Sequence, residues 1–435
     1  MELNPAIIEL VRRSKDFAGD VYDQPGVALT VGEGRRFLMT HPQLYDLIQM
    51  SLVLTATPQS GTFALAEGYL YTREAHRLYL NRLRPGGFLS IIDDHGTRNF
   101  RQLITSLSVL EEGGRGTGAA MRHAAVIENT RKDGMGYRHL LLISPTPISE
   151  ASAERILTLS RSRGLTPLWV PGRVARAPFD ALARMGRMAF LAAHPLELSP
   201  PTDEHPFFFY FGKGARGYFS VVRTLGVVAL LSAFLAALFA RRHKRALGAQ
   251  SWRPLLAAFL LGAAFMCLEG GLLQRLTLAA GGPTEIFAIL LFSLLFWCGL
   301  GSRLACVLGR RFSFGLPEAC VGAMLAALAA YFVLGEYYTF TGARSPLFLR
   351  AGIFFSLAPV GLILGGPFPF LLARYVRGDE KAAAVLWGVN GLASVCGAML
   401  TIALPVAWGV RANFLAGGLL YGAAAWITRG GEKGP

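Results

Sequence analysis

Asp93, Asp94 and His95 are adjacent polar residues that follow an apolar run, 88–92, in the first half of the chain. The run predicts a buried strand, and the carboxyl end of a strand is where α/β sheets place ligand contacts. Neighbouring carboxyl groups can also differ in pKa and divide the roles of acid and base between them. Asp93 and Asp94 are therefore the candidate catalytic residues. The alternative is a solvated turn in which an Asp caps the next helix.

Four further polar residues, Glu269, Gln274, Arg275 and Asn390, lie within or beside long apolar runs in the second half. A carboxylate is costly in hydrocarbon, so Glu269 is expected to face other helices, with Gln274 or Arg275 as a partner. Asn390 lies among small residues, which allow close helix packing. These intramembrane polar residues fit either a transport site or polar contacts between helices, and the sequence leaves both open.

The apolar runs themselves predict a polytopic membrane domain over residues 218–428, with the lipid bilayer as its partner. Most runs approach or exceed the roughly 20 residues that a helix needs to cross a bilayer. The sequence Gly365-Gly366-Pro367-Phe368-Pro369 is expected to break or end one of these helices, and broken helices can mark transport sites. The seven runs are 219–240, 255–273, 286–302, 317–335, 351–372, 383–407 and 412–427.

The composition agrees with a membrane protein and argues against a nucleic-acid-binding protein and against a protein stabilised by metal ions or disulfides. The formal net charge is +15 and the mean hydropathy is +0.40, but basic clusters such as Arg241-Arg242 flank the apolar runs, where membrane topology accounts for them. No motif combines aromatic and basic residues in the manner of nucleic-acid-binding proteins, so we expect no nucleic-acid partner. The five cysteines lie in or beside the apolar runs without CxxC spacing, so we predict neither a metal site nor a disulfide framework.

Residues 1–195 alternate between short apolar runs and helical periodicity, which is typical of an α/β domain with a mainly parallel sheet. A turn is expected at 85–87, and a loop at 113–118, where a glycine-rich sequence lacks the Lys-Ser/Thr of a phosphate-binding loop. Residues 196–217 are expected to form a linker and an interfacial segment whose phenylalanines lie at headgroup level. Predicted strands cover 26–31, 45–52, 88–92, 126–127 and 140–143, and predicted helices cover 70–83, 98–111 and 149–162.

Seven short motifs follow one another in an order that identifies a protein family more specifically than any single motif does. They are Glu2-Leu3-Asn4-Pro5, Gly32-Glu33-Gly34-Arg35, Tyr45-Asp46-Leu47-Ile48, Leu83-Arg84-Pro85-Gly86-Gly87, Asp203-Glu204-His205-Pro206-Phe207-Phe208-Phe209, Leu268-Glu269 with Leu273-Gln274-Arg275, and Trp387-Gly388-Val389-Asn390-Gly391. In this order they resemble the spermidine synthase-like branch of the S-adenosylmethionine-dependent Rossmann enzymes. The resemblance is closer to bacterial membrane proteins in which such a domain is fused to transmembrane helices, and it covers nearly the whole chain.

The resemblance implies a Rossmann-like, methyltransferase-type α/β domain followed by about seven membrane helices in the bacterial inner membrane. It also implies a donor, S-adenosylmethionine or its decarboxylated form, from which an aminopropyl or methyl group is transferred in polyamine metabolism. In a Rossmann-type site an acidic residue hydrogen-bonds the ribose, and Glu2 matches that residue. Glu33, next to Gly34, matches a residue on the adenine side, with a polar turn residue as the alternative interpretation.

Two departures from the family pattern bear on activity. The chain begins at the second strand of the expected sheet, so the first strand and the glycine-rich loop are missing, and an N-terminally truncated sequence is expected. The strand at 45–52 ends in Gln49-Met50-Ser51-Leu52, without the Asp that takes a proton from the attacking amine in spermidine synthases. General-base catalysis needs a titratable group within reach of that proton. The alternative function is therefore a non-catalytic membrane protein or transporter whose α/β domain binds a nucleoside or polyamine without turnover.

The charges of the loops predict a topology. One set of loops carries thirteen Arg and Lys residues and the opposite set carries four, so the positive-inside rule places the first set in the cytoplasm. With seven crossings the α/β domain would lie outside the cell, which conflicts with a cytosolic nucleoside donor. The side of the α/β domain therefore stays open.

Overall fold

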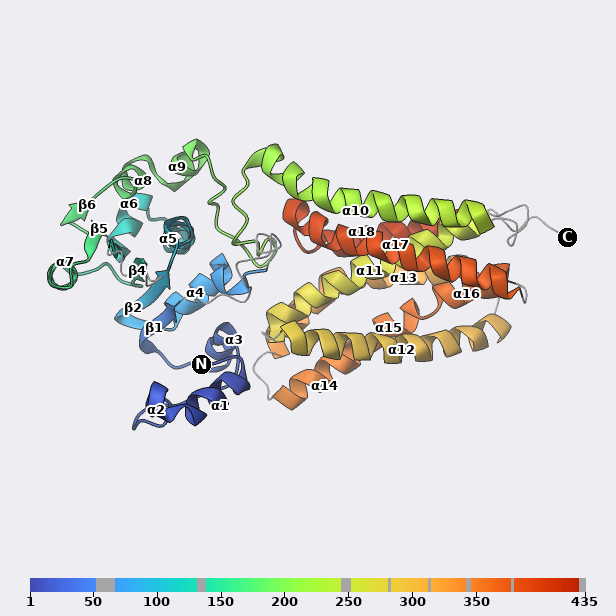
Figure 1. The fold of residues 1–435 in the computed structure, drawn as a ribbon, viewed down its shortest axis with the longest axis horizontal. Coiled ribbons are helices and arrows are strands. Elements are labelled where there is room, and N and C mark those ends of the chain that lie inside the picture. Colours follow the sequence, from blue (N-terminus) through green and yellow to red (C-terminus); the bar gives the residue numbers. More distant parts are fainter. Residues whose placement is uncertain are drawn as a thin grey trace. The chain divides into compact units, whose positions relative to one another are not determined.

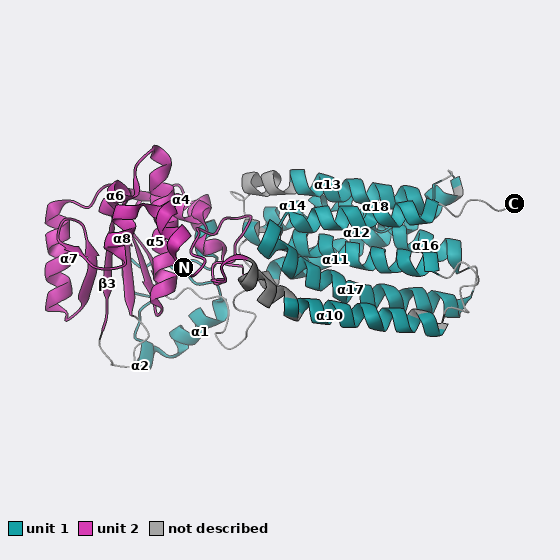
Figure 2. Cartoon of the chain, turned by 90° about the horizontal axis from the view of Figure 1, so that it is seen from above, with its two compact units in different colours: residues 1–36, 218–435 teal, residues 37–217 magenta. Residues whose placement is uncertain are grey.

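The computed structural model describes residues 1–51, 67–130, 138–243, 252–280, 283–311, 314–341, 346–376 and 379–429. The chain forms two compact units (Figure 2). We call Phe37–Gly217 the α/β unit, and Met1–Arg36 with Tyr218–Pro435 the helical unit. The first 36 residues thus group with the long helices of the second half.

The α/β unit is built on a six-stranded mixed sheet with the order β1-β2-β4-β3-β5-β6 (Figure 1). The β1–β2 pair is parallel and the other four pairs are antiparallel. The α/β class is confirmed, whereas the prediction of a mainly parallel pairing is wrong. The strands are β1 (Tyr45–Ser51), β2 (Leu83–Asp93), β3 (Ala124–Glu128), β4 (His139–Ile143), β5 (Thr166–Val170) and β6 (Val174–Ala175).

Short connections explain two of the four antiparallel pairs, β3–β4 and β5–β6. Residues 129–138 join β3 to β4, and residues 171–173 join β5 to β6. A parallel pair needs a crossover of about a dozen residues or more, so these strands can only turn back beside their predecessors. β4 lies between β2 and β3 and is antiparallel to both, so β2 and β3 run in the same direction.

Most of the predicted elements of this unit are confirmed. The strands at 45–52, 88–92, 126–127 and 140–143 correspond to β1, β2, β3 and β4. The helices at 70–83, 98–111 and 149–162 correspond to α4, α5 and α7. The strands β5 and β6 and the smaller elements η2, η3, α6, η4, α8 and α9 were not predicted. The helices are η2 (Tyr69–Tyr71), α4 (Arg73–Asn81), α5 (Gly96–Leu110), η3 (Glu111–Gly113), α6 (Thr117–Ala120), η4 (Met121–His123), α7 (Glu150–Ser162), α8 (Phe179–Met185) and α9 (Arg187–Ala193).

Two local predictions are wrong. The residues 26–31 do not form a strand; Val31 makes one isolated bridge with Glu2, because no neighbouring strand extends the pairing. The predicted turn at 85–87 lies inside β2, as an irregularity in its pairing with β1. A Cβ on Gly87 would come within 2.9 Å of the Asp46 carbonyl oxygen, so only glycine fits this close approach.

Helix α5 forms the centre of the core of the α/β unit. Its side chains Leu103, Ile104 and Leu107 have no exposed surface and belong to one apolar cluster with Leu89 and Leu141 of the sheet. Full burial of a leucine side chain contributes about 2 kcal/mol relative to exposure. The helix is therefore fixed against the sheet, and its first turn follows directly on the end of β2.

The helical unit begins with two short helices, α1 (Pro5–Arg13) and α2 (Lys15–Ala18), and the next helix, α3 (Gly34–Thr40), crosses the boundary between the two units at Phe37. The Asn4 side chain caps α1 by accepting the Ala6 N–H at 3.0 Å, and Pro5 occupies the first helical position. The long helices follow as α10 (Gly214–His243), α11 (Trp252–Ala280), α12 (Pro283–Arg311), α13 (Leu316–Thr341), α14 (Pro346–Ser356), α15 (Ala358–Leu364), α16 (Pro367–Tyr375), α17 (Glu380–Trp408) and α18 (Ala412–Arg429).

Five segments of the described chain are helices long and apolar enough to cross a membrane, which supports a membrane protein. Helix α10 has a shorter apolar stretch, Leu225–Phe239, so a total of seven crossings stays a prediction. The five segments are Trp252–Leu278, Glu285–Gly309, Leu316–Val333, Leu347–Tyr375 and Glu380–Trp408. The fourth is interrupted at Gly365 and Gly366, where the sequence predicts a break.

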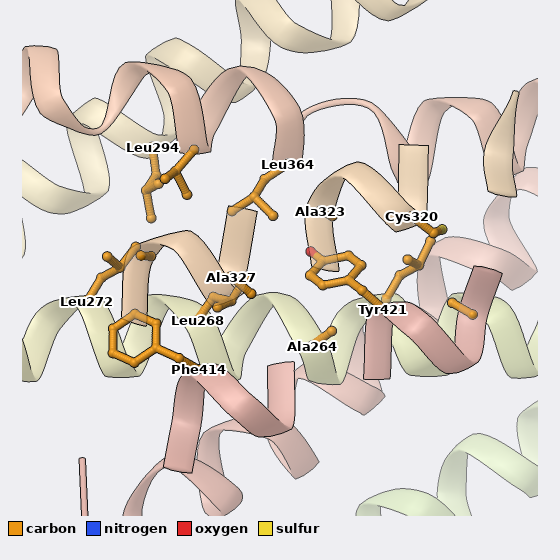
Figure 3. Close-up of a cluster of buried hydrophobic side chains, with 14 of the residues drawn as sticks. Ala264, Leu268, Leu272, Leu294, Cys320, Ala323, Ala327, Leu364, Phe414 and Tyr421 are labelled. Atoms are coloured by element: carbon orange, nitrogen blue, oxygen red, sulfur yellow. The ribbon is translucent and has the colours of Figure 1, made fainter. Parts of the chain in front are cut away.

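Helix α11 packs between α17 and α18 through glycines. A Cβ on Gly397 would come within 2.6 Å of the Ala263 carbonyl oxygen, and one on Gly417 within 2.9 Å of the Leu268 side chain. Small residues of this kind let helix backbones approach closely in a membrane. The apolar interior of the unit continues from α11 to α12, α13, α15 and α18 (Figure 3).

A cytoplasmic C-terminus is expected for the helical unit. The ends of α10, α12, α16 and α18 and the starts of α11 and α17 carry the excess of basic residues, and these ends lie together in the bundle (Figure 1). The positive-inside rule assigns them to the cytoplasm. A green fluorescent protein fused after Pro435 should fluoresce, and an alkaline phosphatase at the same place should be inactive. Active phosphatase would contradict this topology.

Candidate functional site

The polar carboxyl ends of β1 and β2 form the candidate site of the α/β unit. The two strands are parallel, so their carboxyl ends meet at one edge of the sheet. Asp93 is the last residue of β2 and is 4% exposed. At the end of β1 the Gln49 Nε2 donates to the Ser51 Oγ at 2.8 Å. The predicted position of Asp93 at a strand end is therefore confirmed.

Arg98 forms an ion pair with each of the two candidate carboxylates. Its Nε lies 3.0 Å from the Asp93 Oδ1, and its Nη2 forms an ion pair with Asp94. The side chain of Asp94 is 44% exposed and that of Arg98 only 12%. Asp93 is thus a fixed, buried carboxylate, whereas Asp94 remains accessible to a ligand.

His95, rather than an Asp, caps the N-terminus of α5 in the turn after β2. The His95 Nδ1 accepts the Thr97 N–H at 3.3 Å at the start of α5, and the His95 N–H donates to the Asp93 Oδ1 at 3.0 Å. The alternative interpretation of this stretch, a capping Asp in a solvated turn, is therefore wrong for the buried Asp93. The Asp93 carboxylate orders the turn from inside the protein.

Burial raises the pKa of the Asp93 carboxyl, and the positive charge of Arg98 opposes this rise. Burial, followed by the negative charge of Asp93, also raises the pKa of the nearby Tyr71 phenol. Tyr71 therefore stays a neutral phenol beside the carboxylate. The three side chains can hold a polar ligand group through a charged acceptor, a neutral phenol and a guanidinium.

His139 joins this site through the sheet register. It is the first residue of β4 and is paired with Asp93 of β2. A Cβ on Gly96 would come within 3.2 Å of the His139 ring, so the ring lies against the turn after β2. Burial lowers the pKa of His139, which favours the neutral imidazole. The antiparallel return of β4, which the sequence does not reveal, brings His139 to this site.

The segment 199–211 is anchored in the α/β unit next to Tyr71. The Phe208 ring stacks on Tyr71 with a centroid distance of 4.3 Å. The Asp203 Oδ1 accepts the Thr72 hydroxyl at 2.7 Å. Phe207, Phe208 and Phe209 are buried in the core of the unit, whereas the sequence predicted an interfacial position for them.

A buried guanidinium holds the same segment. The Arg101 Nη1 donates to the carbonyl oxygens of Phe208 at 2.6 Å and Tyr210 at 2.7 Å, and the Nε donates to that of Ser199 at 3.1 Å. Burial lowers the pKa of Arg101 to about 10, so the guanidinium is still charged at neutral pH. The segment that carries the Asp203 motif is thus fixed by α5, which also carries Arg98.

Glu2, Glu33 and Gly34, the predicted cofactor-binding residues, belong to the helical unit. The Glu2 Oε1 accepts the Asn4 N–H at 2.9 Å. The Glu33 oxygens accept the N–H groups of Arg35 at 2.9 Å and Arg36 at 2.8 Å, where α3 begins at Gly34. Burial raises the pKa of Glu33. The capping contacts agree with the alternative interpretation of Glu33 as a turn residue, and cofactor binding by these residues stays a prediction.

The polar residues of the long helices fall into two groups. Asn390 and Gln274 have partners on neighbouring helices: the Asn390 Nδ2 donates to the Ala258 carbonyl oxygen at 3.0 Å, which supports its role in helix contacts. Glu269 has no hydrogen bond or ion pair with any residue of the described ranges, and the structure does not pair it with Gln274 or Arg275.

Gln274 belongs to a buried polar cluster at Thr401. Pro405 lies inside α17 and has no N–H, so the Thr401 carbonyl lacks its helical donor. The Gln274 Nε2 donates to this oxygen at 3.3 Å, and the Asn413 Nδ2 donates to it at 3.2 Å. The Asn413 Nδ2 also donates to the Gln274 Oε1 at 3.0 Å. Sequence reasoning missed Asn413, which is fully buried at the start of α18.

Comparisons with known proteins add no assignment. No protein-family model matches the chain, and no curated protein matches it in sequence. Within the ranges that the structure describes, no group of three or more His, Cys, Asp or Glu side chains is arranged to hold a metal ion. The chemistry of the site therefore has to be argued from its own residues.

Proposed function

We propose that the protein is a membrane-anchored relative of the spermidine synthase-like transferases, with a nucleoside-type ligand site at the carboxyl ends of β1 and β2. The position of the buried Asp93 at that edge is the observation that carries the proposal. The order of the seven sequence motifs supports the same family. A Rossmann-type ancestry is compatible with a sheet in which β1, β2 and β3 share one direction.

The finer parts of the proposal follow from the family resemblance. They are a bacterial inner-membrane location, seven crossings, a donor of the S-adenosylmethionine type and a polyamine acceptor. When bound, such a donor supplies an activated aminopropyl or methyl group. The residues of the chain fit the polar part of such a ligand, because a hydroxyl or amine can donate to the carboxylates of Asp93 and Asp94.

The side chains at this edge can also move a proton. Asp94 is accessible and His139 is a neutral imidazole in the same site, so either can accept a proton from an amine. Arg98 holds the two carboxylates in place and offsets their charge. Asp93, the least accessible, is suited to binding and orientation. Asp94 or His139 would thus take the place of the general-base Asp, which is missing from the end of β1.

Ligand binding to the full chain in detergent micelles tests the proposal. S-Adenosylmethionine and its decarboxylated form are titrated separately by calorimetry, which distinguishes a methyl-type from an aminopropyl-type donor. Asp93→Asn is expected to weaken binding about tenfold to a hundredfold, because hydrogen bonds to charged groups contribute about 1.5–3 kcal/mol. Binding should also weaken as the pH falls, because protonated Asp93 loses its charge.

Asp46→Asn is the matched control. Asp46 is an exposed carboxylate near the start of β1, where it pairs with Arg84, away from the carboxyl end of β2. The Asp46→Asn variant is expected to bind the donor compound as tightly as the wild type does. Failure of both compounds to bind the wild type would overturn the proposal. Equal weakening by the two variants would place the ligand elsewhere.

Transport is the second candidate function. One observation favours it: Glu269 lies inside a membrane-type helix, and the described residues offer it no partner. Ionisable residues in such positions commonly lie on ion or proton pathways.

A further inference from the structure

The two helices at the start of the chain, α1 and α2, leave large apolar side chains uncovered. Ile7 and Leu10 of α1 are 42% and 62% exposed, and Phe17 of α2 is 96% exposed. Ile7 and Leu10 are three residues apart and therefore lie on one face of α1. Within these two helices, which the structure describes in full, only Ile8 is buried, and it lies opposite Leu10. The uncovered side chains thus point away from the rest of the protein.

The charged side chains of α1 and α2 gather on the other side. Arg12 of α1 and Lys15 of α2 pair with the same carboxylate, Asp23, at 3.2 Å and 3.6 Å. Two positions along a helix correspond to about 200°, so Leu10 points away from Arg12. For the same reason Phe17 points away from Lys15. Since Asp23 holds the two charged side chains together, Leu10 and Phe17 share the opposite side, which we call the apolar face of α1–α2.

The start of α1 is held near the ends of two membrane helices. The Gly32 N–H donates to the Glu2 carbonyl oxygen at 3.0 Å, which fixes the start of α1 beside Gly32. Four residues further along, which extend at most about 14 Å, Arg36 interacts with an ion pair. The pair joins Glu285 to Arg350, in the first turns of the second and fourth candidate spans. The first 36 residues also group with the long helices, and both views draw α1 beyond the end of the bundle where α12 begins (Figure 1, Figure 2).

The bilayer surface is the partner that matches this position and this chemistry. Interfacial helices insert apolar side chains about 5–10 Å into the headgroup boundary. A helix tethered beside a membrane span meets lipid at a high effective concentration, whereas a second copy of the chain must first diffuse to it. The charges of the segment pair with one another, among them Lys15 with Asp20 at 2.9 Å, so apolar burial rather than charge drives the contact.

We propose that α1 and α2 form an interfacial anchor, which lies along the bilayer surface and inserts Leu10 and Phe17 between the lipid headgroups. The partner is the lipid surface rather than a particular headgroup, because the charges of the anchor are already paired. The anchor requires only the membrane-spanning helices, and it is independent of the proposed transferase activity.

Photo-crosslinking of the full chain in phosphatidylcholine vesicles tests the anchor. The photoreactive residue p-benzoylphenylalanine replaces Leu10, Phe17 or, as the matched control, Arg12, which is half-exposed on the charged side of α1. Mass spectrometry of the labelled peptide then identifies the molecule to which each position is joined. Lipid adducts are expected at Leu10 and Phe17 and should be largely lost at Arg12.

Trypsin digestion of the vesicles gives a second, independent measurement. The Arg13 side chain is 75% exposed and belongs to the anchor, so cleavage there should be slow while the anchor is docked. The double variant Leu10→Asp/Phe17→Asp should be cleaved several times faster, because charged side chains are costly to insert into lipid. Leu159→Asp changes a leucine of similar exposure on α7 and is the matched control. It should be cleaved at Arg13 like the wild type.

Three results would overturn the anchor. Crosslinks from Leu10 and Phe17 to a second copy of the chain, seen as a band of twice the mass, would make the apolar face a dimer interface. Crosslinks to another segment of the same chain would show that the protein itself covers this face. Lipid adducts that are absent at Leu10 and Phe17, or equal to those at Arg12, would show that the apolar face does not meet the bilayer.

Discussion

Arg101→Met is expected to destabilise the α/β unit by about 3–5 kcal/mol, because it leaves several buried carbonyl oxygens without a donor. The guanidinium is 4% exposed and donates to the backbone oxygens of Ser199, Phe207, Phe208 and Tyr210. A loss of this size is a large part of the stability of a domain. The segment 199–211 should detach first, because all four of these acceptor oxygens belong to it.

Urea unfolding, followed by near-ultraviolet circular dichroism and limited proteolysis at 199–211, measures this effect. Arg77→Met is the matched control: Arg77 is an exposed arginine that pairs with Glu112, and its loss should cost about 1 kcal/mol or less. Arg101→Lys keeps the charge but not the planar fork, so it should rescue only part of the stability. Equal unfolding midpoints for the Arg101 and Arg77 variants to Met would contradict the argument.

Asn413→Ala is expected to destabilise the helical unit by about 1–3 kcal/mol, because the Thr401 carbonyl oxygen keeps only the longer hydrogen bond from Gln274. Pro405→Ala restores the helical N–H at this position. In the Pro405→Ala background, the loss of Asn413 should therefore cost less than in the wild type. The double-mutant cycle isolates this coupling from the cavity that either single change leaves.

Steric trapping or unfolding in mixed detergent micelles gives the four free energies of this cycle. Asn390→Ala serves as the control, because Asn390 donates to the Ala258 oxygen inside α11, where no proline removes the helical donor. Its cost should not depend on Pro405. An additive cycle for Asn413 and Pro405 would show that the cluster at Thr401 does not depend on the proline.

The positions of most helices and strands could be predicted from the sequence, but the pairing of the strands could not. Helices such as α4, α5 and α7 have a local apolar periodicity, so their positions follow from the chain itself. The pairing of strands depends on connections and register, which is why the antiparallel return of β4 and the position of His139 beside Asp93 were not predicted. The apolar run at 26–31 has the composition of a strand but only one bridging residue.

The same limit holds for the polar residues of the helices. Glu269 and Gln274 stand out in the sequence because they interrupt apolar runs. Their surroundings are set by distant residues; for example, Pro405 and Asn413 determine the contacts of Gln274. A proline four residues after a helical carbonyl is visible in the sequence, but the donor that replaces its N–H is visible only in the fold.

The edge strand β1 has a consequence for the solution behaviour of the α/β unit. No strand of the described residues pairs with the outer edge of β1, and Leu47 on this strand is 54% exposed. Open backbone groups next to an apolar side chain form a template on which further strands can add, and such edges lead to aggregation. Asp46, with its exposed charge paired to Arg84, is the residue on β1 that opposes this association. A separately expressed α/β unit therefore requires a charged or proline-substituted β1 edge to remain monomeric at high concentration.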